Sequence, residues 1–144
     1  LVLELLIGRS SDLYEQLYGE GLINSSFGAD VSVEKQYAFS VLGGESPDPL
    51  QVRERFCHVL EAAKKNGLDR AACERLIRSF RGRFMRQFNS VERISHSFIS
   101  VYFKGVSMFD YLDVYDKITF EYVNEVLHEH FKPESLAMSV IRPV

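Results

Sequence analysis

The segment from Gly8 to Gly44 constrains the fold most strongly, because a helical pattern is followed at once by two alternating ones. Its first part predicts a helix that ends at a glycine-rich turn, with Ser10, Ser11 and Asp12 as candidate caps. Residues 25–33 then alternate apolar and polar side chains, as a β-strand does. After a short polar turn at 34–36, residues 37–42 form a second predicted strand. Two strands this close in sequence predict an antiparallel hairpin.

Beyond Pro47 the pattern changes from strands to helices. Apolar residues recur at helical spacing within about 50–66, 70–88, 91–104, 108–116 and 119–131. Leu136, Met138 and Val140 then alternate again, which predicts a third strand over residues 136–141. The order predicts an α+β fold, in which a layer of helices covers one face of an antiparallel sheet.

One of these helices carries an apolar residue at every fourth position, namely Ala72, Leu76, Phe80, Phe84 and Phe88. Residues four apart lie on one side of a helix, so this stripe predicts a buried face between the helices and the sheet.

Composition independently describes an ordinary globular domain. The chain has 144 residues, a net charge of −3 and 46% hydrophobic residues, which indicates a single domain. No apolar run approaches the ~20 residues that a membrane span needs, and no segment resembles a signal peptide. We therefore expect no membrane association. Cys57 and Cys73 both lie in predicted helices and are expected to be buried free thiols.

Six arginines lie close together between residues 70 and 86: Arg70, Arg75, Arg78, Arg81, Arg83 and Arg86. A nucleic-acid interface would need a basic domain behind such a face, whereas this chain is acidic overall. A solvated helix face is the favoured interpretation. A positively charged chamber wall that attracts acidic peptides is a third interpretation.

Several segments also resemble one known family. Ser-Ser-x-Leu-Tyr-x-x-Leu-Tyr-x-x-Gly-Leu-Ile at residues 10–23 resembles the helix-to-strand junction of the insulinase, pitrilysin and mitochondrial processing peptidase family. The helix from Gly67-Leu68-Asp69 to Phe84, the segment 111–134 and the final segment 136–143 are similar to later parts of the same template. The resemblance is nearest to a bacterial, cytosolic branch of zinc-protease-like proteins, and it implies paired α+β half-domains that face each other.

The resemblance also allows a search for the family's zinc motif, His-x-x-Glu-His. Glu129 and His130 match its end, but Val126 stands where the first histidine should be. His128 and His130 diverge by about 200° around a helix, so they cannot bind one ion from regular helix geometry. We interpret both as a solvated helix end, and we expect no metal or other cofactor in this chain. His58 and His96 are isolated. Zinc is implied for a partner half-domain.

The resemblance implies that, in catalytically complete relatives, the half-domain without zinc supplies an arginine and a tyrosine that hold the substrate carbonyl. Tyr18 and Asn24 occupy these positions here, with one residue fewer between them. Neither supplies a fixed cation, although either could donate a hydrogen bond. They are the candidate substrate contacts; otherwise they are residues of a helix end and a strand start. No residue is predicted to be catalytic.

Together these observations predict that residues 1–144 form one half-domain, inactive alone, that lines part of a peptide-enclosing chamber opposite an N-terminal zinc-bearing half-domain. By resemblance, a strand and most of a helix would precede Leu1, so we expect a truncated fragment of a larger, cytoplasmic zinc-protease-like protein. As an isolated chain, it should form a homodimer through open sheet edges. The alternative is an inactive binding or scaffold module that mediates protein–protein association.

Overall fold

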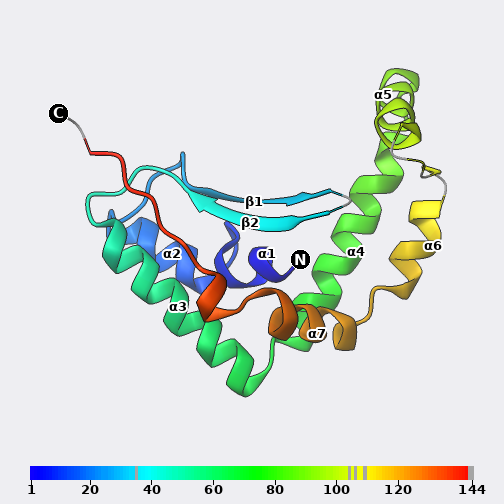
Figure 1. The fold of residues 1–144 in the computed structure, drawn as a ribbon. Helices are drawn as coiled ribbons and strands as arrows, with labels where there is room; N and C mark the ends of the chain where they lie inside the picture. The colour runs from blue at the N-terminus through cyan, green and yellow to red at the C-terminus, as the bar shows by residue number, and fades with distance from the viewer. Residues whose placement is uncertain (35, 104, 106, 109, 143–144) are drawn as a thin grey trace. The chain divides into compact units, whose positions relative to one another are not determined.

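A computed structural model describes residues 1–34, 36–103, 105, 107–108 and 110–142, apart from the side chains of Leu112 and Asp116. The chain divides into two compact units, residues 69–125 and the remainder. The elements follow in the order α1 (Val2–Ile7), α2 (Asp12–Gly19), β1 (Gly28–Val33), β2 (Ala38–Gly43), α3 (Pro49–Asn66), α4 (Arg70–Gln87), α5 (Val91–Tyr102), α6 (Asp110–Lys117), α7 (Phe120–His130) and the short 3-10 helix η1 (Pro133–Ser135) (Figure 1).

The first unit contains the predicted hairpin. β1 and β2 pair antiparallel, from Gly28 opposite Gly43 to Val33 opposite Ala38. The polar turn expected between them includes Lys35, which lies outside the described residues. Helices α1, α2 and α3 pack together, and α1 also contacts β1, so these helices lie on one face of the hairpin (Figure 1). The predicted α+β fold, with helices on one face of an antiparallel sheet, is confirmed.

The core of this unit forms where α2 turns back toward the hairpin. The Ser11 hydroxyl accepts a hydrogen bond from the backbone N–H of Tyr14 and so caps α2. Leu17 is fully buried, and its carbonyl accepts hydrogen bonds from the two residues that follow Gly21. Gly21 has φ +72°, a conformation that glycine adopts readily and that directs the chain into the core. Buried neighbours in this unit include Leu3, Leu6, Ile7, Leu13, Leu22, Ile23, Phe27, Val52, Phe56 and Leu60.

The hairpin itself is more exposed than its alternating sequence suggests. Phe27, immediately before β1, is 6% exposed, but Val31 and Val33 are 49% and 63% exposed. On β2, Phe39 and Val41 are each 47% exposed. Phe39 and Val41 pair with polar residues of β1, whereas Val31 and Val33 lie on the other face, so both faces carry exposed apolar groups.

The third strand expected over residues 136–141 is wrong. The chain instead forms η1 at Pro133–Ser135 and continues without regular structure through residue 142. The backbone of Leu136 is extended, with φ −89° and ψ 120°, yet none of the described residues provides a ladder partner for this segment. An alternating sequence sets the side-chain pattern, but a strand also needs a paired neighbour. Pro143, at the end of the matching family segment, lies outside the described residues.

The second unit is built from α4, α5 and α6, together with the first part of α7. The carboxylate of Asp69 accepts hydrogen bonds from the backbone N–H groups of Ala71 and Ala72, so it caps α4. Phe84 is 9% exposed, and its ring neighbours include Tyr111 and Tyr115 of α6, with centroids 6.0 and 5.3 Å away. The expected stripe is only partly buried: Phe84 packs against α6, whereas Ala72, Leu76, Phe80 and Phe88 are half-buried.

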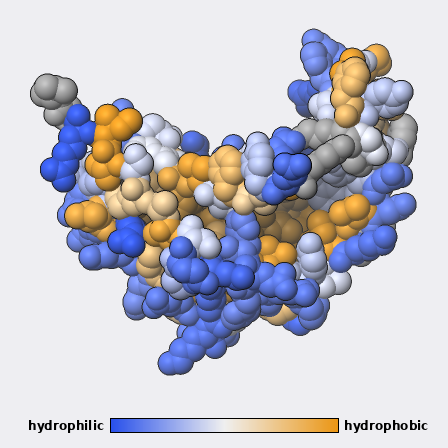
Figure 2. Space-filling view, viewed as in Figure 1, coloured by the Kyte–Doolittle hydropathy of each residue, from blue (hydrophilic) through white to orange (hydrophobic). Residues whose placement is uncertain are grey.

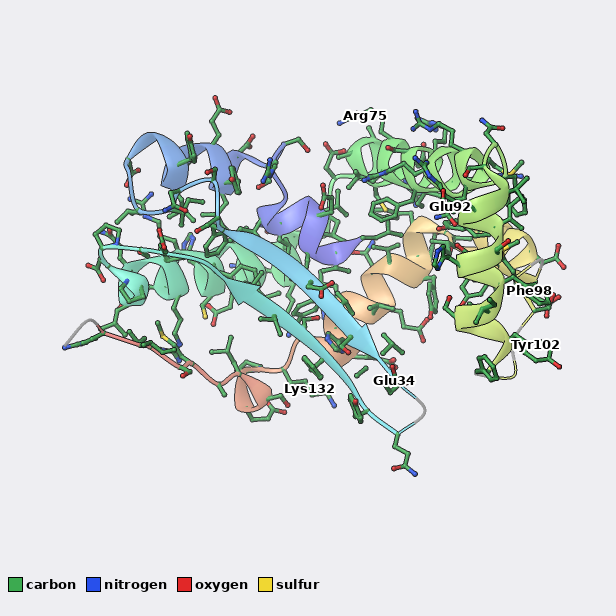
Figure 3. The ribbon with its side chains drawn as sticks, turned by 90° about the horizontal axis from the view of Figure 1, so that it is seen from above. Glu34, Arg75, Glu92, Phe98, Tyr102 and Lys132 are labelled. Carbon is green, nitrogen blue, oxygen red and sulfur yellow. The ribbon has the colours of Figure 1, made fainter. Side chains whose placement is uncertain are left out.

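α5 has no buried residue within the described part of the chain. Phe98 and Tyr102 stack with ring centroids 5.6 Å apart, yet they are 43% and 63% exposed. They project from α5 in Figure 3, and apolar side chains appear in orange over α5 in Figure 2. No described helix is both long and apolar enough to cross a membrane.

Candidate functional site

The two candidate substrate contacts lie on either side of the turn after α2. Tyr18 is 52% exposed on α2 and stacks on Tyr14, with ring centroids 6.0 Å apart. The side-chain oxygen of Asn24 accepts hydrogen bonds from the backbone N–H and the hydroxyl of Ser26, at 2.8 and 2.5 Å. The amide nitrogen of Asn24 donates to Glu45 at 2.8 Å. Asn24 thus holds the loop before β1, whereas the exposed ring of Tyr18 is accessible.

The histidines at the end of α7 differ in their surroundings. His128 is exposed, as expected for a solvated helix end. His130 is half-buried, its Nε2 atom lies 2.8 Å from the Ser40 hydroxyl of β2, and its ring meets Phe131 edge-on. The interpretation of His130 as a solvated residue is therefore wrong. Among the residues that the structure describes, no three His, Cys, Asp or Glu side chains are grouped so as to hold a metal ion.

The two cysteines are free thiols in different surroundings. Cys73 is fully buried on α4, as expected, whereas Cys57 is only half-buried on α3, so the expected burial of Cys57 is wrong. Burial raises the pKa of the Cys73 thiol, because the thiolate would lose its hydration. Since the thiolate is the nucleophilic form, Cys73 is a packing residue rather than a reactive one.

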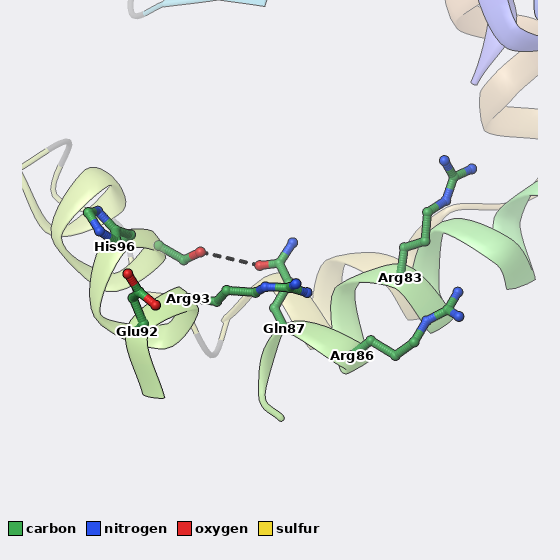
Figure 4. Close-up of a pocket in the computed structure, with 7 residues that line it drawn as sticks. Arg83, Arg86, Gln87, Glu92, Arg93 and His96 are labelled. Carbon is green, nitrogen blue, oxygen red and sulfur yellow. Dashed lines mark hydrogen bonds between the residues drawn. The ribbon is translucent and has the colours of Figure 1, made fainter. Parts of the chain in front are cut away.

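A hollow of about 830 Å³ lies between the end of α4 and the start of α5, within the second unit. Its lining consists of Arg83, Arg86, Gln87, Glu92, Arg93, His96 and Ser97 (Figure 4). The Ser97 hydroxyl donates a hydrogen bond to the side-chain oxygen of Gln87 at 3.3 Å, which ties the two helices together. The hollow is open to solvent, and four of its seven lining residues carry charged groups, so it suits a charged ligand.

The charge of this hollow is predominantly positive. Three of its lining residues are arginines, and Glu92 is the one carboxylate among them. The guanidinium of Arg83 lies 4.3 Å from the centre of the Phe80 ring, which holds that side chain in place. Among the described residues, no ion pair joins Glu92 to a lining arginine. The hollow therefore presents guanidinium groups that are available to an anion.

The sequence identified part of this site. Arg83 and Arg86 belong to the arginine group on α4, whereas Arg70 of the same group pairs with Glu121 and Glu74. Arg93 and His96 were missed because they lie on the next helix. Their spacing in the sequence could have identified them. Glu92, Arg93, His96 and Ser97 lie together on one side of α5, opposite its apolar residues.

The fold is shared with a solved peptidase. The structure superposes on the crystal structure of a putative M16-like peptidase from Alicyclobacillus acidocaldarius with a TM-score of 0.80 and 24% sequence identity. The match covers 89% of this chain and 31% of that one. At this identity the similarity shows a common fold, that of an M16-like peptidase.

Sequence comparison confirms the family relationship. The chain is 34% identical over 144 residues to the uncharacterized zinc protease YmfH of Bacillus subtilis (strain 168), a match that covers 99% of this chain and 33% of that protein. No family model matches the chain. The chain is therefore related to the zinc-protease-like proteins of the insulinase family, and it spans about a third of the length of the relatives it matches.

Proposed function

We propose that the chain is a non-catalytic half-domain of a zinc-protease-like protein, and that it forms one wall of a peptide-enclosing chamber opposite a zinc-bearing half-domain. The observation that carries this proposal is the extent of the sequence match. Nearly the whole chain aligns with one third of a protein described as a zinc protease. The remaining two thirds of that relative leave room for a zinc-bearing half-domain.

The end of α7 supports a non-catalytic role. A zinc-binding helix of the His-x-x-Glu-His type needs two histidines four residues apart on one face. Val126 stands four residues before His130, and a valine side chain cannot bind a metal. His130 itself already contacts Ser40. This segment therefore fastens α7 to the hairpin, and the zinc chemistry is assigned to the partner.

Within the proposed chamber, Tyr18 is the better of the two candidate substrate contacts. Its side chain is half-exposed, whereas the amide of Asn24 is occupied by Ser26 and Glu45. Neither residue carries the fixed positive charge that would polarise a carbonyl strongly. This favours a second candidate function, an inactive binding or scaffold module that associates with another protein without helping to cleave peptides.

The decisive experiment combines the chain with a separately produced zinc-protease-like polypeptide that carries the His-x-x-Glu-His motif. We expect a one-to-one complex in analytical ultracentrifugation, and zinc-dependent cleavage of quenched fluorescent peptides by the complex. Replacing the motif glutamate of the partner with glutamine is the control, because it should abolish cleavage but not assembly. A complex without cleavage would support the scaffold function. Chelator-sensitive cleavage by this chain alone would contradict both proposals.

A further inference from the structure

We propose that the hollow between α4 and α5 binds an acidic peptide segment through the carboxylates of neighbouring aspartate or glutamate residues. The choice of a peptide rests on the proposed function, whereas the anionic character of the ligand follows from the residues that line the hollow. Nothing in the family relationship assigns this site.

Two helices supply the arginines of the hollow. Arg83 and Arg86 come from the last turns of α4, and Arg93 comes from the first turn of α5 (Figure 4). The planar guanidinium group of arginine can donate two parallel hydrogen bonds to one carboxylate. Three such groups around one hollow can therefore bind more than one carboxylate of the same peptide.

Contacts within and between α4 and α5 hold the hollow in shape. These contacts leave most of the arginine charge available to a ligand. The hydrogen bond from Ser97 to Gln87 connects the two helices, and the Ser90 hydroxyl caps α5 by accepting from the backbone N–H of Arg93. The Phe80 ring supports the guanidinium of Arg83. Groups that are already positioned lose less conformational entropy when a ligand binds.

Around the hollow, arginines outnumber the carboxylates that are nearest in sequence. Between residues 69 and 100 the chain has seven arginines, Arg70, Arg75, Arg78, Arg81, Arg83, Arg86 and Arg93, but three carboxylates, Asp69, Glu74 and Glu92. Asp69 caps α4, and Glu74 pairs with Arg70. Glu92 therefore remains as the one acidic group at the hollow, where it can accept hydrogen bonds from the backbone N–H groups of a peptide.

The geometry of α5 favours a peptide over a nucleic acid. Single-stranded nucleic acids bind where aromatic side chains stack on bases beside a basic groove. The exposed aromatic residues of α5 are Phe98 and Tyr102, and Tyr102 lies roughly 180° around the helix from Arg93. A strand whose phosphates occupied the hollow could not stack its bases on these rings, and Glu92 would repel its continuous negative charge.

Fluorescence anisotropy with a fluorescein-labelled hexaglutamate peptide tests the proposal, with labelled hexaglutamine and a single-stranded oligonucleotide as comparison ligands. The test variant combines Arg86→Gln with Arg93→Gln. The matched control combines Arg75→Gln with Arg78→Gln, which removes the same charge from exposed positions of α4 that do not line the hollow (Figure 3 shows Arg75). We expect roughly tenfold weaker hexaglutamate binding for the test variant and less than twofold for the control.

Arg86→Lys combined with Arg93→Lys keeps the charge but removes the paired donors, so it should bind with intermediate affinity. Circular dichroism checks that each variant is folded. Equal weakening by the test and control pairs, no hexaglutamate binding by the unchanged protein, or tighter binding of the oligonucleotide would each overturn the proposal. The assay needs no zinc and no partner, so its failure would leave the half-domain proposal standing, and failure of the partner experiment would leave this binding measurement intact.

Discussion

The Ser40 hydroxyl and the Nε2 atom of His130 lie 2.8 Å apart, a contact that joins β2 to the end of α7 across 90 positions of sequence. Both side chains are half-buried, and the His130 ring also meets Phe131 edge-on, with centroids 4.9 Å apart. This pair fastens the carboxyl-terminal part of the chain to the hairpin. It also gives His130 a structural role at the position where the family motif would place a zinc ligand.

Removing this contact should destabilise the chain. Ser40→Ala should lower the free energy of unfolding by about 1 kcal/mol, because one partly buried hydrogen bond is lost. His130→Ala should cost more, since the ring contact with Phe131 is lost as well. The exposed His128 provides the control, and His128→Ala should change stability by less than about 0.5 kcal/mol. Urea unfolding measures all three, and equal effects of the two histidine substitutions would contradict the assignment.

The aromatic core of the second unit predicts a larger effect. Phe84 is buried against Phe88, Tyr111 and Tyr115, so Phe84→Ala should lower the free energy of unfolding by roughly 3–5 kcal/mol. Arg78 is exposed on the same helix, and Arg78→Ala should stay within about 0.5 kcal/mol. If both variants shift the urea midpoint equally, the buried face of α4 has been misassigned.

The pairing of Arg70 with Glu121 predicts a pH dependence. The hydrogen bond from Arg70 lowers the pKa of the Glu121 carboxyl below its ordinary value. A lowered folded-state pKa stabilises the protein above the unfolded-state pKa, and this stabilisation is lost as the pH falls through the folded-state value. The stability difference between the unchanged protein and Arg70→Gln should therefore be largest near neutral pH. It should shrink below about pH 4.3, the ordinary pKa of glutamate.

Urea unfolding at pH 7 and pH 3 measures this change. Arg70 also lies 4.3 Å from the centre of the Phe120 ring, and that contact does not depend on the ionisation of Glu121, so part of the difference should remain at pH 3. Arg75→Gln is the control for general charge effects. A difference for Arg70→Gln that is the same at both pH values would contradict the role of Glu121.

The sequence predicted well what depends on neighbours along the chain. Ser11, one of the three candidate caps, accepts the backbone hydrogen bond that caps α2, and α3 and α4 lie within a residue of the segments predicted from helical spacing. These features follow from residues within one or two turns of helix. The antiparallel hairpin could also be predicted from the sequence, because only a short turn separates its strands.

Features that depend on distant pairing were missed. The third strand was wrong because alternation at residues 136–141 does not show whether another strand lies beside them. The contact between Ser40 and His130 has no local signal, since its two residues lie on separate elements. The basic hollow was predicted only in part. The arginines of α4 could be recognised in the sequence, but whether Arg93 lines the same hollow depends on how α5 follows α4.

Self-association of the isolated chain is expected from the exposed hairpin. The sheet has two strands within the described residues, so the outer edge of each strand lacks a paired neighbour there. Val33 and Tyr37, at the turn end of the hairpin, are 63% and 58% exposed. Open edges and apolar surface favour a symmetric dimer, which should bury at least ~1,000 Å². Light scattering over a concentration series checks this, and a strict monomer at high micromolar concentration would rule it out.

The zinc content of the isolated chain shows whether it is a non-catalytic half-domain. Protein purified without a histidine tag would be incubated with zinc, passed through gel filtration and examined by metal analysis. We expect far less than one zinc per chain, because Val126 cannot act as a ligand and His130 contacts Ser40. One tightly held zinc per chain that is lost in the His130→Ala variant would contradict the assignment of this chain as a non-catalytic half-domain.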